Sequence, residues 1–308
     1  MGVDSHLVAW IMDYLTDRPQ YVRLRECRSD TVVRSTGALQ GTVLSLVLFI
    51  LYTLDFKYNS ESCHVQKFAD DTAIVGCIRC DQEEEYRKLS QDFVTWCDSN
   101  HLHLNTTKTK EMVVDLRRPR AHPEPVTINS DHVELIQTYK YLGVHLDDRL
   151  DWTANTDALC RRGQSRLYFL RRLASFNICK KLLQVFYQTV VASALFYAVV
   201  CWGGSIKKKD ASRLDKLVRK AGSVLGTELD RLTSVAEQRA LNRLLSIMDN
   251  PLHPLHSTIY RQRSSFRDRL LSLSCSTERL RRSFLPHAIR LFNSTQGRKT
   301  LNSNMSAL

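Results

Sequence analysis

Apolar residues in the first 150 positions recur at two different periods, which predict a mixture of helices and strands. In His6–Leu15 they recur at helical spacing, and Asp17-Arg18-Pro19 should then end the amphipathic helix. Val43–Leu54 is apolar almost throughout and predicts a buried helix, whereas Asp81–Asn100 predicts a helix with one polar face. Strands are predicted over the ranges Tyr21–Cys27, Thr31–Ser35, Val65–Phe68, Thr72–Val75, Lys110–Leu116 and Tyr139–Leu146.

Short turns should connect several of these strands. The first two would meet at Ser29-Asp30. The next two are separated by Asp70-Asp71, which predicts a hairpin with an acidic tip of two residues. Gly143 lies inside the predicted strand Tyr139–Leu146, and a glycine in that position often marks the close approach of another backbone or of a ligand.

From Trp152 onward the pattern becomes helical. One helix would be lined by Leu159, Leu167, Leu170 and Leu173. Further helices are predicted over Ile178–Trp202, Ser212–Leu225, Val235–Met248, Tyr260–Leu273 and Glu278–Phe292, with a frayed tail from Arg298. The fold class is therefore α+β. We expect an antiparallel sheet with helices over residues 1–150, a helical domain over 151–230 and a basic helical region over 231–308.

The charges of the chain are divided unevenly between its two halves. Residues 1–150 carry 17 Lys and Arg against 22 Asp and Glu, whereas residues 151–308 carry 27 against 10. A basic half of this kind favours a polyanionic partner, and nucleic acid is the usual one because binding releases counterions from its phosphates. A well-solvated basic surface is the alternative.

The nine cysteines form no regular disulfide framework, which favours reduced thiols and an intracellular location, nuclear or cytoplasmic. Residues 1–20 do not resemble a signal peptide. Val185–Trp202 is long enough to cross a bilayer, but Gln188, Thr189 and Ser193 interrupt it, so a buried helix and no membrane partner are predicted.

Asp70 and Asp71 are the strongest local signal of chemistry. Two adjacent carboxylates repel each other and favour a counter-ion, and Mg2+ commonly binds one or two carboxylates together with substrate phosphates. Turns also favour Asp for backbone reasons alone, so the pair by itself leaves both interpretations open.

Three further segments surround the pair in the sequence and form an ordered set with it. They are Gly37-Ala38-Leu39-Gln40-Gly41 with Ser45, Leu104-Asn105-Thr106-Thr107-Lys108-Thr109-Lys110-Glu111, and Tyr139-Lys140-Tyr141-Leu142-Gly143. These three segments resemble, in the order given, motifs B, D and E of the reverse transcriptases of non-LTR (LINE-type) retrotransposons. Phe68-Ala69-Asp70-Asp71, which lies between the first and the second of them, resembles motif C. The resemblance extends from residue 1 to about residue 295.

The resemblance implies a partial right-hand polymerase palm followed by a thumb-like helical domain. Asp70 and Asp71 would hold catalytic Mg2+, Lys108 would lie near the nucleotide phosphates, and Tyr141, Leu142 and Gly143 would form the primer grip. Substrate would be bound by Gly37, Gln40, Gly41, Phe68 and Ala69. Nucleic acid would be bound by Arg161, Arg162, Arg171, Arg172, Lys180, Lys181, Lys207, Lys208 and Lys209. The implied partners are an RNA template, an RNA–DNA duplex and a deoxynucleotide, and the oligomeric state is left open.

Two departures from the family pattern affect the expected activity. Leu39 and Leu46 replace the prolines of motif B, which would loosen that turn. Motif A, with the aspartate that bridges both metal ions, is not found in the 308 residues. We therefore expect a truncated and catalytically incomplete member of the nucleotidyltransferase lineage, and whether it is an enzyme stays uncertain at this point.

Three alternatives remain. The chain could be a non-catalytic nucleic-acid-binding module, or a non-functional fossil of a mobile element. The segment around Tyr141–Leu173 also resembles part of the AlkB-type tRNA-modifying enzymes, although the sequence has no convincing His-x-Asp iron site with a distal His.

Overall fold

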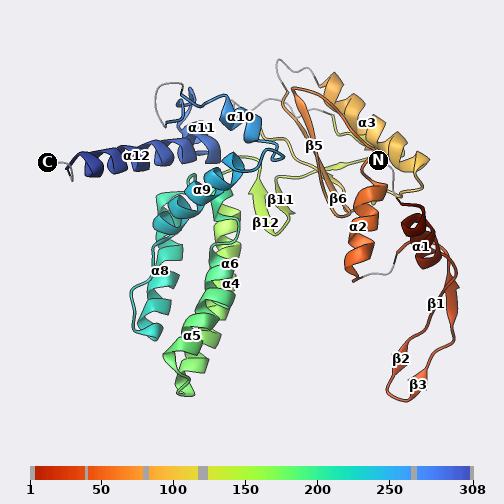
Figure 1. The fold of residues 1–308 in the computed structure, drawn as a ribbon, viewed down its shortest axis with the longest axis horizontal. Coiled ribbons are helices and arrows are strands. Elements are labelled where there is room, and N and C mark those ends of the chain that lie inside the picture. The colour runs from red at the N-terminus through yellow and green to blue at the C-terminus, as the bar shows by residue number, and fades with distance from the viewer. Residues whose placement is uncertain (1–3, 39–40, 79–82, 117–123, 265–268, 306–308) are drawn as a thin grey trace. The chain divides into compact units, whose positions relative to one another are not determined.

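The computed structural model describes residues 4–38, 41–78, 83–116, 124–264 and 269–305, with only the backbone of 296–305. The chain divides into two compact units. The N-terminal unit contains residues 1–109 and 125–133, and the helical unit contains 110–124 and 134–308. Helices and small antiparallel sheets occur together, as predicted, and one pair of short strands is parallel (Figure 1). Among the described residues, no helix combines the length and apolarity needed to cross a membrane.

The described residues of the N-terminal unit form the helices α1 (Ser5–Leu15), α2 (Val43–Tyr52) and α3 (Glu84–Ser99). Its strands are β1 (Arg18–Gln20), β2 (Arg23–Leu24), β3 (Cys27–Arg28), β4 (Val32–Arg34), β5 (Cys63–Phe68), β6 (Asp71–Gly76), β8 (Thr127–Ile128) and β9 (Asp131–His132). The strands pair as antiparallel hairpins, β1 with β4, β2 with β3, β5 with β6 and β8 with β9. The side chain of Asp4 caps α1 by accepting the backbone N–H groups of His6 and Leu7.

Both predicted hairpins exist, but their turns lie elsewhere than expected. The first turns at Arg25-Glu26 and not at Ser29-Asp30, because Leu24 pairs with Cys27 and Arg25 adopts a left-handed φ of 55°. In the second, Phe68 pairs with Asp71, so the tip is Ala69-Asp70 and not Asp70-Asp71. The alternation of apolar and polar residues predicted where these strands lie. It did not predict the hairpin tips, because their positions depend on which residues adopt a positive φ.

Helix α2 was predicted to be buried, and this prediction is wrong. The helix forms, and the Thr42 side chain caps it by accepting the backbone N–H of Ser45 at 3.1 Å. However, no residue of α2 is buried, and Val43 is 82% exposed. An apolar run predicts burial only where another element covers it, and in the described structure most of this helix lacks such a cover.

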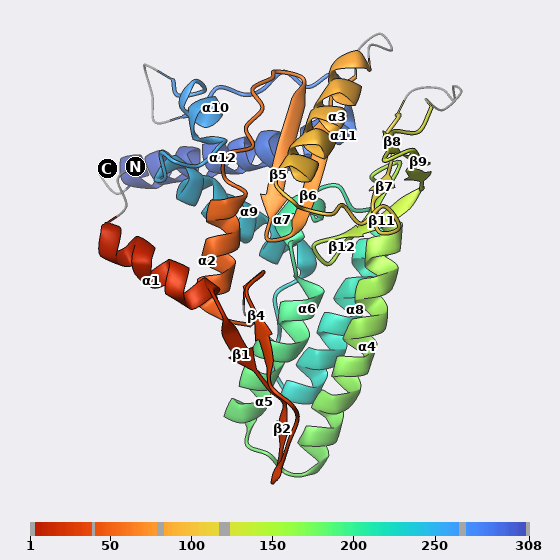
Figure 2. The same cartoon turned by 90° about the vertical axis from the view of Figure 1, so that its right-hand side faces the viewer.

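The helical unit contains the larger hydrophobic core. Helices α4 (Thr153–Ser175) and α8 (Lys208–Leu225) lie side by side in both views (Figures 1 and 2). As predicted, Leu159, Leu167 and Leu170 are buried, and they share a core with Leu214 and Leu217 of α8. The other elements are β7 (Lys110–Glu111), β10 (Glu134–Leu135), β11 (Thr138–Tyr141), β12 (Val144–Asp147), α5 (Lys180–Phe186), η1 (Tyr187–Ala192), α6 (Ser193–Leu195), α7 (Val199–Trp202), α9 (Leu232–Met248), α10 (His256–Tyr260), α11 (Glu278–Arg282) and α12 (Phe284–Met305).

Several predicted elements of this unit are interrupted in the structure. The strand predicted over Lys110–Leu116 is only two residues long, because only Lys110 and Glu111 pair with β10. The helix predicted over Ile178–Trp202 becomes α5, the π-helix η1, α6 and α7, with a break where Ala198 takes a φ of 49°.

The C-terminal predictions need similar corrections. The helix predicted over Tyr260–Leu273 is not found in its described residues 261–264 and 269–273, because α10 ends at Tyr260; residues 265–268 lie outside the described residues. The helix predicted over Glu278–Phe292 is divided at Ser283, and α12 continues to Met305 where a frayed tail was expected.

A buried carboxylate forms the corner between β12 and α4. Asp147 is 7% exposed and accepts the backbone N–H groups of Arg149, Asp151 and Trp152 at 3.0–3.1 Å. Leu150 and Trp152 adopt left-handed φ values of 49° and 66° in this corner. Such conformations cost free energy, and the three hydrogen bonds to one carboxylate offset that cost.

An ion pair joins the same corner to the start of α8. Lys207 Nζ lies 2.6 Å from Asp151 Oδ2, and Asp151 Oδ1 accepts the backbone N–H of Thr153 at 2.9 Å. Burial opposes ionisation of Asp151, but the hydrogen bonds from Lys207 and Thr153 outweigh it and lower its pKa to about 2.

We predict that this ion pair makes the stability of the helical unit depend on acid pH. Because the pKa of Asp151 is lowered in the folded state, the stabilisation is fully present above about pH 4 and is lost as the pH falls towards 2. The Lys207→Met variant should melt about one or two degrees below the parent at pH 6 and show little difference at pH 2. Circular dichroism melts test this, with Lys209→Met as the control, and a difference that does not change with pH would contradict it.

Candidate functional site

The β5–β6 hairpin carries the two predicted metal-binding carboxylates at its end. Asp70 occupies the tip and Asp71 is the first residue of β6, opposite Phe68. Ala69 takes a left-handed φ of 51°, the sign that tight hairpin turns require at their first central residue. Both aspartates are exposed, and Phe68 is 60% exposed. Within the described part of the chain, neither carboxylate has an ion pair or a side-chain hydrogen bond.

Lys67 anchors this hairpin to the rest of the N-terminal unit. Its ammonium group donates hydrogen bonds to the backbone oxygens of Thr53 and Phe56 at the end of α2. The same group lies 5.2 Å from the ring centroid of Phe56 and 5.0 Å from that of Trp96 on α3. Burial lowers the pKa of Lys67, while Asp55 nearby raises it. One side chain on β5 thus contacts the end of α2 and one face of α3.

The predicted substrate loop lies partly outside the described residues, because Leu39 and Gln40 are not described. Gly37 and Gly41 on either side adopt φ values of 69° and 84°, which glycine accommodates without steric cost. The loop therefore requires glycine at both of the predicted positions.

Arg18 holds the start of this loop, and the sequence analysis missed it. The side chain is only 8% exposed, and its Nη2 donates to the backbone oxygens of Thr36 at 2.8 Å and Gly37 at 2.7 Å. Beside it, the carboxylate of Asp17 accepts a hydrogen bond from the Ser35 hydroxyl at 2.8 Å. In the sequence, Arg18 is part of Asp17-Arg18-Pro19, which predicts only the end of the first helix. No local pattern in the sequence indicates this role, because Arg18 is the only buried residue of an otherwise exposed pair of strands.

Lys108 is exposed in a turn that Asn105 organises. The Asn105 side chain accepts the backbone N–H of Lys108 at 3.0 Å and the hydroxyl of Thr107 at 2.7 Å. In the described structure, no hydrogen bond or ion pair links Lys108 to Asp70 or Asp71. The predicted contact of Lys108 with nucleotide phosphates therefore stays a prediction.

The predicted primer grip belongs to the helical unit and forms a hairpin, not a single strand. Tyr141 pairs with Val144, so Leu142 and Gly143 make the tip, with φ values of 45° and 85°. The close approach expected at Gly143 is made by Tyr197, because a Cβ added to Gly143 would lie 3.3 Å from the Tyr197 ring. The Tyr197 hydroxyl also donates to the Leu142 backbone oxygen at 2.8 Å.

Cationic side chains lie near this hairpin. Burial lowers the pKa of His145 on β12, and the charges of Arg162, Lys140 and Arg161 lower it further. Residues 158–209 contain ten Lys and Arg and no Asp or Glu, a signal that was readable in the sequence. Most of the predicted nucleic-acid-binding residues are exposed, namely Arg161, Arg171, Arg172, Lys180, Lys181, Lys207, Lys208 and Lys209, whereas Arg162 is half-buried. Lys207 differs from the others because it is ion-paired with Asp151.

Most aromatic residues of the segment Val185–Trp202, which was predicted to form a buried helix, lie in the core. Tyr187, Phe196 and Trp202 are buried, with Trp202 fully enclosed. Tyr197 is an exception. It is 47% exposed and lies outside the core, over the tip of the β11–β12 hairpin.

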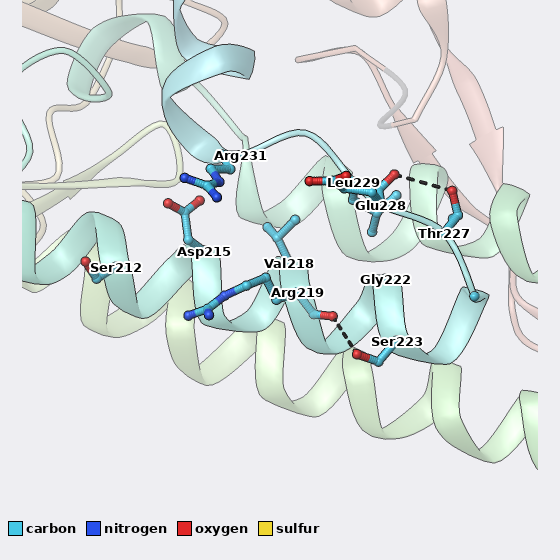
Figure 3. Close-up of a pocket in the computed structure, with 11 residues that line it drawn as sticks. Ser212, Asp215, Val218, Arg219, Gly222, Ser223, Thr227, Glu228, Leu229 and Arg231 are labelled. Atoms are coloured by element: carbon cyan, nitrogen blue, oxygen red, sulfur yellow. Dashed lines mark hydrogen bonds between the residues drawn. The ribbon is translucent and has the colours of Figure 1, made fainter.

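The described residues contain no cluster of three or more His, Cys, Asp or Glu side chains suited to a metal ion. A cavity of about 660 Å3 lies elsewhere, between α8 and the loop that leads to α9. Asp215, Arg219 and Arg231 line it together, so its wall has no single sign of charge (Figure 3). Asp215 already accepts the backbone N–H of Leu232 at 2.8 Å, which marks a structural role at the start of α9. The cavity contains none of the predicted site residues.

Residues 1–146 match the family described as reverse transcriptase (RNA-dependent DNA polymerase). This part of the chain is therefore similar in sequence to reverse transcriptases. The matched range contains the loop at Gly37, the Asp70-Asp71 hairpin and the hairpin tip at Leu142.

Curated relatives support the same relationship over a longer part of the chain. The chain is 26% identical over 274 residues, 84% of its length and 29% of the relative's, to the "Probable RNA-directed DNA polymerase from transposon BS" of Drosophila melanogaster. It is 25% identical over 203 residues, 63% of its length and 22% of the relative's, to the "Probable RNA-directed DNA polymerase from transposon X-element" of the same species. It is 26% identical over 193 residues, 58% of its length and 20% of the relative's, to the "RNA-directed DNA polymerase from mobile element jockey" of Drosophila funebris. The chain thus spans less than a third of the length of these relatives. No solved structure matches.

A second family match covers a short part of the reverse transcriptase-like chain. Residues 152–193 match the family described as alkylated DNA repair protein alkB homolog 8, N-terminal. The range covers α4, α5 and the whole of η1, which contribute buried residues to the core of the helical unit. Among the described residues of this range, no group of three or more His, Cys, Asp or Glu side chains could hold a metal ion.

We predict that Lys67→Ala destabilises the N-terminal unit by about 1–3 kcal/mol, because a partly buried ammonium group loses two carbonyl partners and two aromatic rings. Urea unfolding measures this, with Lys57→Ala as the control because Lys57 is an exposed lysine nearby. Equal unfolding midpoints for the two variants would show that Lys67 does not anchor the hairpin.

Proposed function

We propose that the chain is a part of the RNA-directed DNA polymerase of a non-LTR retrotransposon, and that it contributes the later half of the palm and the thumb. The observation that carries the proposal is the reverse transcriptase match over residues 1–146, with Asp70 and Asp71 at the end of an exposed hairpin inside it. The palm would occupy residues 1–150, the thumb 151–230 and a basic helical region 231–308. The proposed place of action is inside the cell, in the nucleus or cytoplasm.

The donor set at the tip suits Mg2+. Asp70 and Asp71 are exposed carboxylates without a counter-ion among the described residues, and oxygen ligands of this kind are those that Mg2+ prefers. When bound, the ion would neutralise charge on the transferring phosphoryl group. The part of the protein is to hold both carboxylates at one rigid turn, so that no reorganisation is needed when the substrate arrives.

The tip alone does not provide a complete two-metal site. Two ions about 3.5–4 Å apart need carboxylates from more than one strand. Three other aspartates of the N-terminal unit have structural partners. Asp4 caps α1, Asp17 binds the Ser35 hydroxyl, and Asp55 accepts the indole N–H of Trp96 at 3.3 Å. The resemblance assigns the third carboxylate to motif A, which is not found in the 308 residues, so we expect them by themselves to be inactive.

The proposed partners follow from the charges and from the two hairpins. An RNA template and its RNA–DNA duplex would contact the exposed basic residues of α4, α5 and α8, mainly through phosphates. The tip at Leu142-Gly143, supported by Tyr197, would hold the primer end. Gly37, Gln40 and Gly41 would border the template and nucleotide, with Phe68 and Ala69 beside the incoming deoxynucleotide and Lys108 near its phosphates.

A non-catalytic nucleic-acid-binding role is the second candidate. Residues 158–209 favour this role, because they contain ten Lys and Arg and no Asp or Glu. Such basic residues can bind phosphates without a metal site. The two candidates differ in whether Asp70 and Asp71 matter to the function.

We predict that the 308-residue polypeptide binds an RNA–DNA duplex with an affinity that falls steeply with salt, but incorporates no deoxynucleotide with Mg2+ or Mn2+. Electrophoretic mobility shifts and primer extension on a homopolymer template measure the two properties. Incorporation that Asp70→Ala abolishes would show that the site is complete. Absence of any duplex binding at low salt would contradict the proposed function itself.

A further inference from the structure

One exposed face of α4 alternates arginine and aromatic side chains. Arg161, Ser165, Tyr168, Arg172 and Phe176 follow one another at intervals of four, three, four and four residues. These intervals place all five on one line along the helix. We call this line the α4 stripe. It is about 22 Å long at the rise of an α-helix.

The rings of the stripe face solvent. Tyr168 is 62% exposed and Phe176 is 63% exposed. Phe169 lies beside Tyr168 with its ring centroid 5.5 Å away, and the Arg172 guanidinium lies 5.1 Å from the Phe176 ring centroid. The core of the unit does not need these rings, because α4 buries a different face that includes Leu167 and Leu170.

The charge around the stripe has one sign. Asp157 is the last acidic residue before it, and the next one in the sequence is Asp210. Both of these aspartates are ion-paired with Arg213. No acidic residue between Asp157 and Asp210 is therefore available to pair with the exposed arginines of the stripe. This charge pattern favours the binding of a polyanion.

We propose that the α4 stripe binds single-stranded nucleic acid, with Arg161 and Arg172 on phosphates and Tyr168 and Phe176 stacked on bases. The inference rests on the proposed nucleic-acid function and names the form of the ligand at this face. Paired bases are already stacked within a duplex, so exposed rings have bases to stack on only where the strand is unpaired. Arginine side chains alone would suffice to bind the phosphates of a duplex, whereas the aromatic residues beside the arginines favour a single strand.

Fluorescence anisotropy with a labelled oligouridine tests the proposal on the full chain. Tyr168→Ala and Phe176→Ala should each weaken binding about ten-fold, with the salt dependence unchanged, because stacking does not release counterions. Arg172→Ala should instead reduce the slope of log affinity against log salt by about 0.7, the value for one phosphate contact on a single strand. Phe176→Trp should restore binding, since any large ring can stack.

The matched control is Tyr260→Ala on α10. Tyr260 is 60% exposed and has the Arg263 guanidinium 5.2 Å from its ring centroid, but it lies outside the stripe. This variant should bind as the parent does. Circular dichroism melts verify that every variant folds.

The proposal is wrong if the aromatic variants bind oligouridine as tightly as the control, or if they lose RNA–DNA duplex and single strand equally. It is also wrong if the same substitutions abolish self-association and leave RNA binding intact, because the stripe would then be a contact between copies. Loss of duplex binding in the parent chain, with oligouridine binding retained, would count against the polymerase role and leave this inference standing.

Discussion

Electrostatic repulsion between two neighbouring carboxylates is the constraint on which the account of this chain depends. Asp70 and Asp71 follow each other in sequence, and the pairing of Phe68 with Asp71 keeps both at one tight turn. Exposure to water makes their proximity tolerable, and a divalent cation would make it favourable. The hairpin is held in place by Lys67, whose ammonium group bonds to the end of α2 and contacts the ring of Trp96 on α3. The hairpin that carries the proposed metal ligands is thus also anchored to α2 and α3.

The sequence located most elements in this molecule but misplaced the turns that define the sites. Helices α1, α3, α4 and α8 were predictable because their apolar residues recur at a clear helical period. The tip at Ala69-Asp70 and the hairpin at Leu142-Gly143 were not located correctly, since neither contains the Asn-Gly or Asp-Gly pairs that usually announce such turns. Arg18 was missed because its role lies in hydrogen bonds to the backbone of a distant loop, which no local pattern records.

The sequence alone also did not predict which apolar helices are buried. The apolar composition of α2 predicted a core helix, yet the structure leaves Val43 and Leu51 exposed, and Trp10 of α1 is 53% exposed as well. Exposed apolar surface of this kind is typical of an interaction face. In the helical unit, the sequence also did not show which charged residues are already ion-paired. Lys207 looked like its neighbours Lys208 and Lys209, but it is ion-paired with Asp151 and supports the fold.

The most direct test of the central claim is Fe2+-directed hydroxyl-radical cleavage of the full chain in the presence of an RNA–DNA primer–template. Fe2+ takes the same oxygen ligands as Mg2+ and cleaves the backbone close to where it binds, so the readout needs no catalytic turnover. The account predicts cleavage next to Ala69-Asp70, competed by Mg2+ and lost in Asp70→Asn but retained in Asp131→Asn at the other hairpin, β8–β9. Cleavage that is absent from the tip, or that persists unchanged in Asp70→Asn, would contradict it.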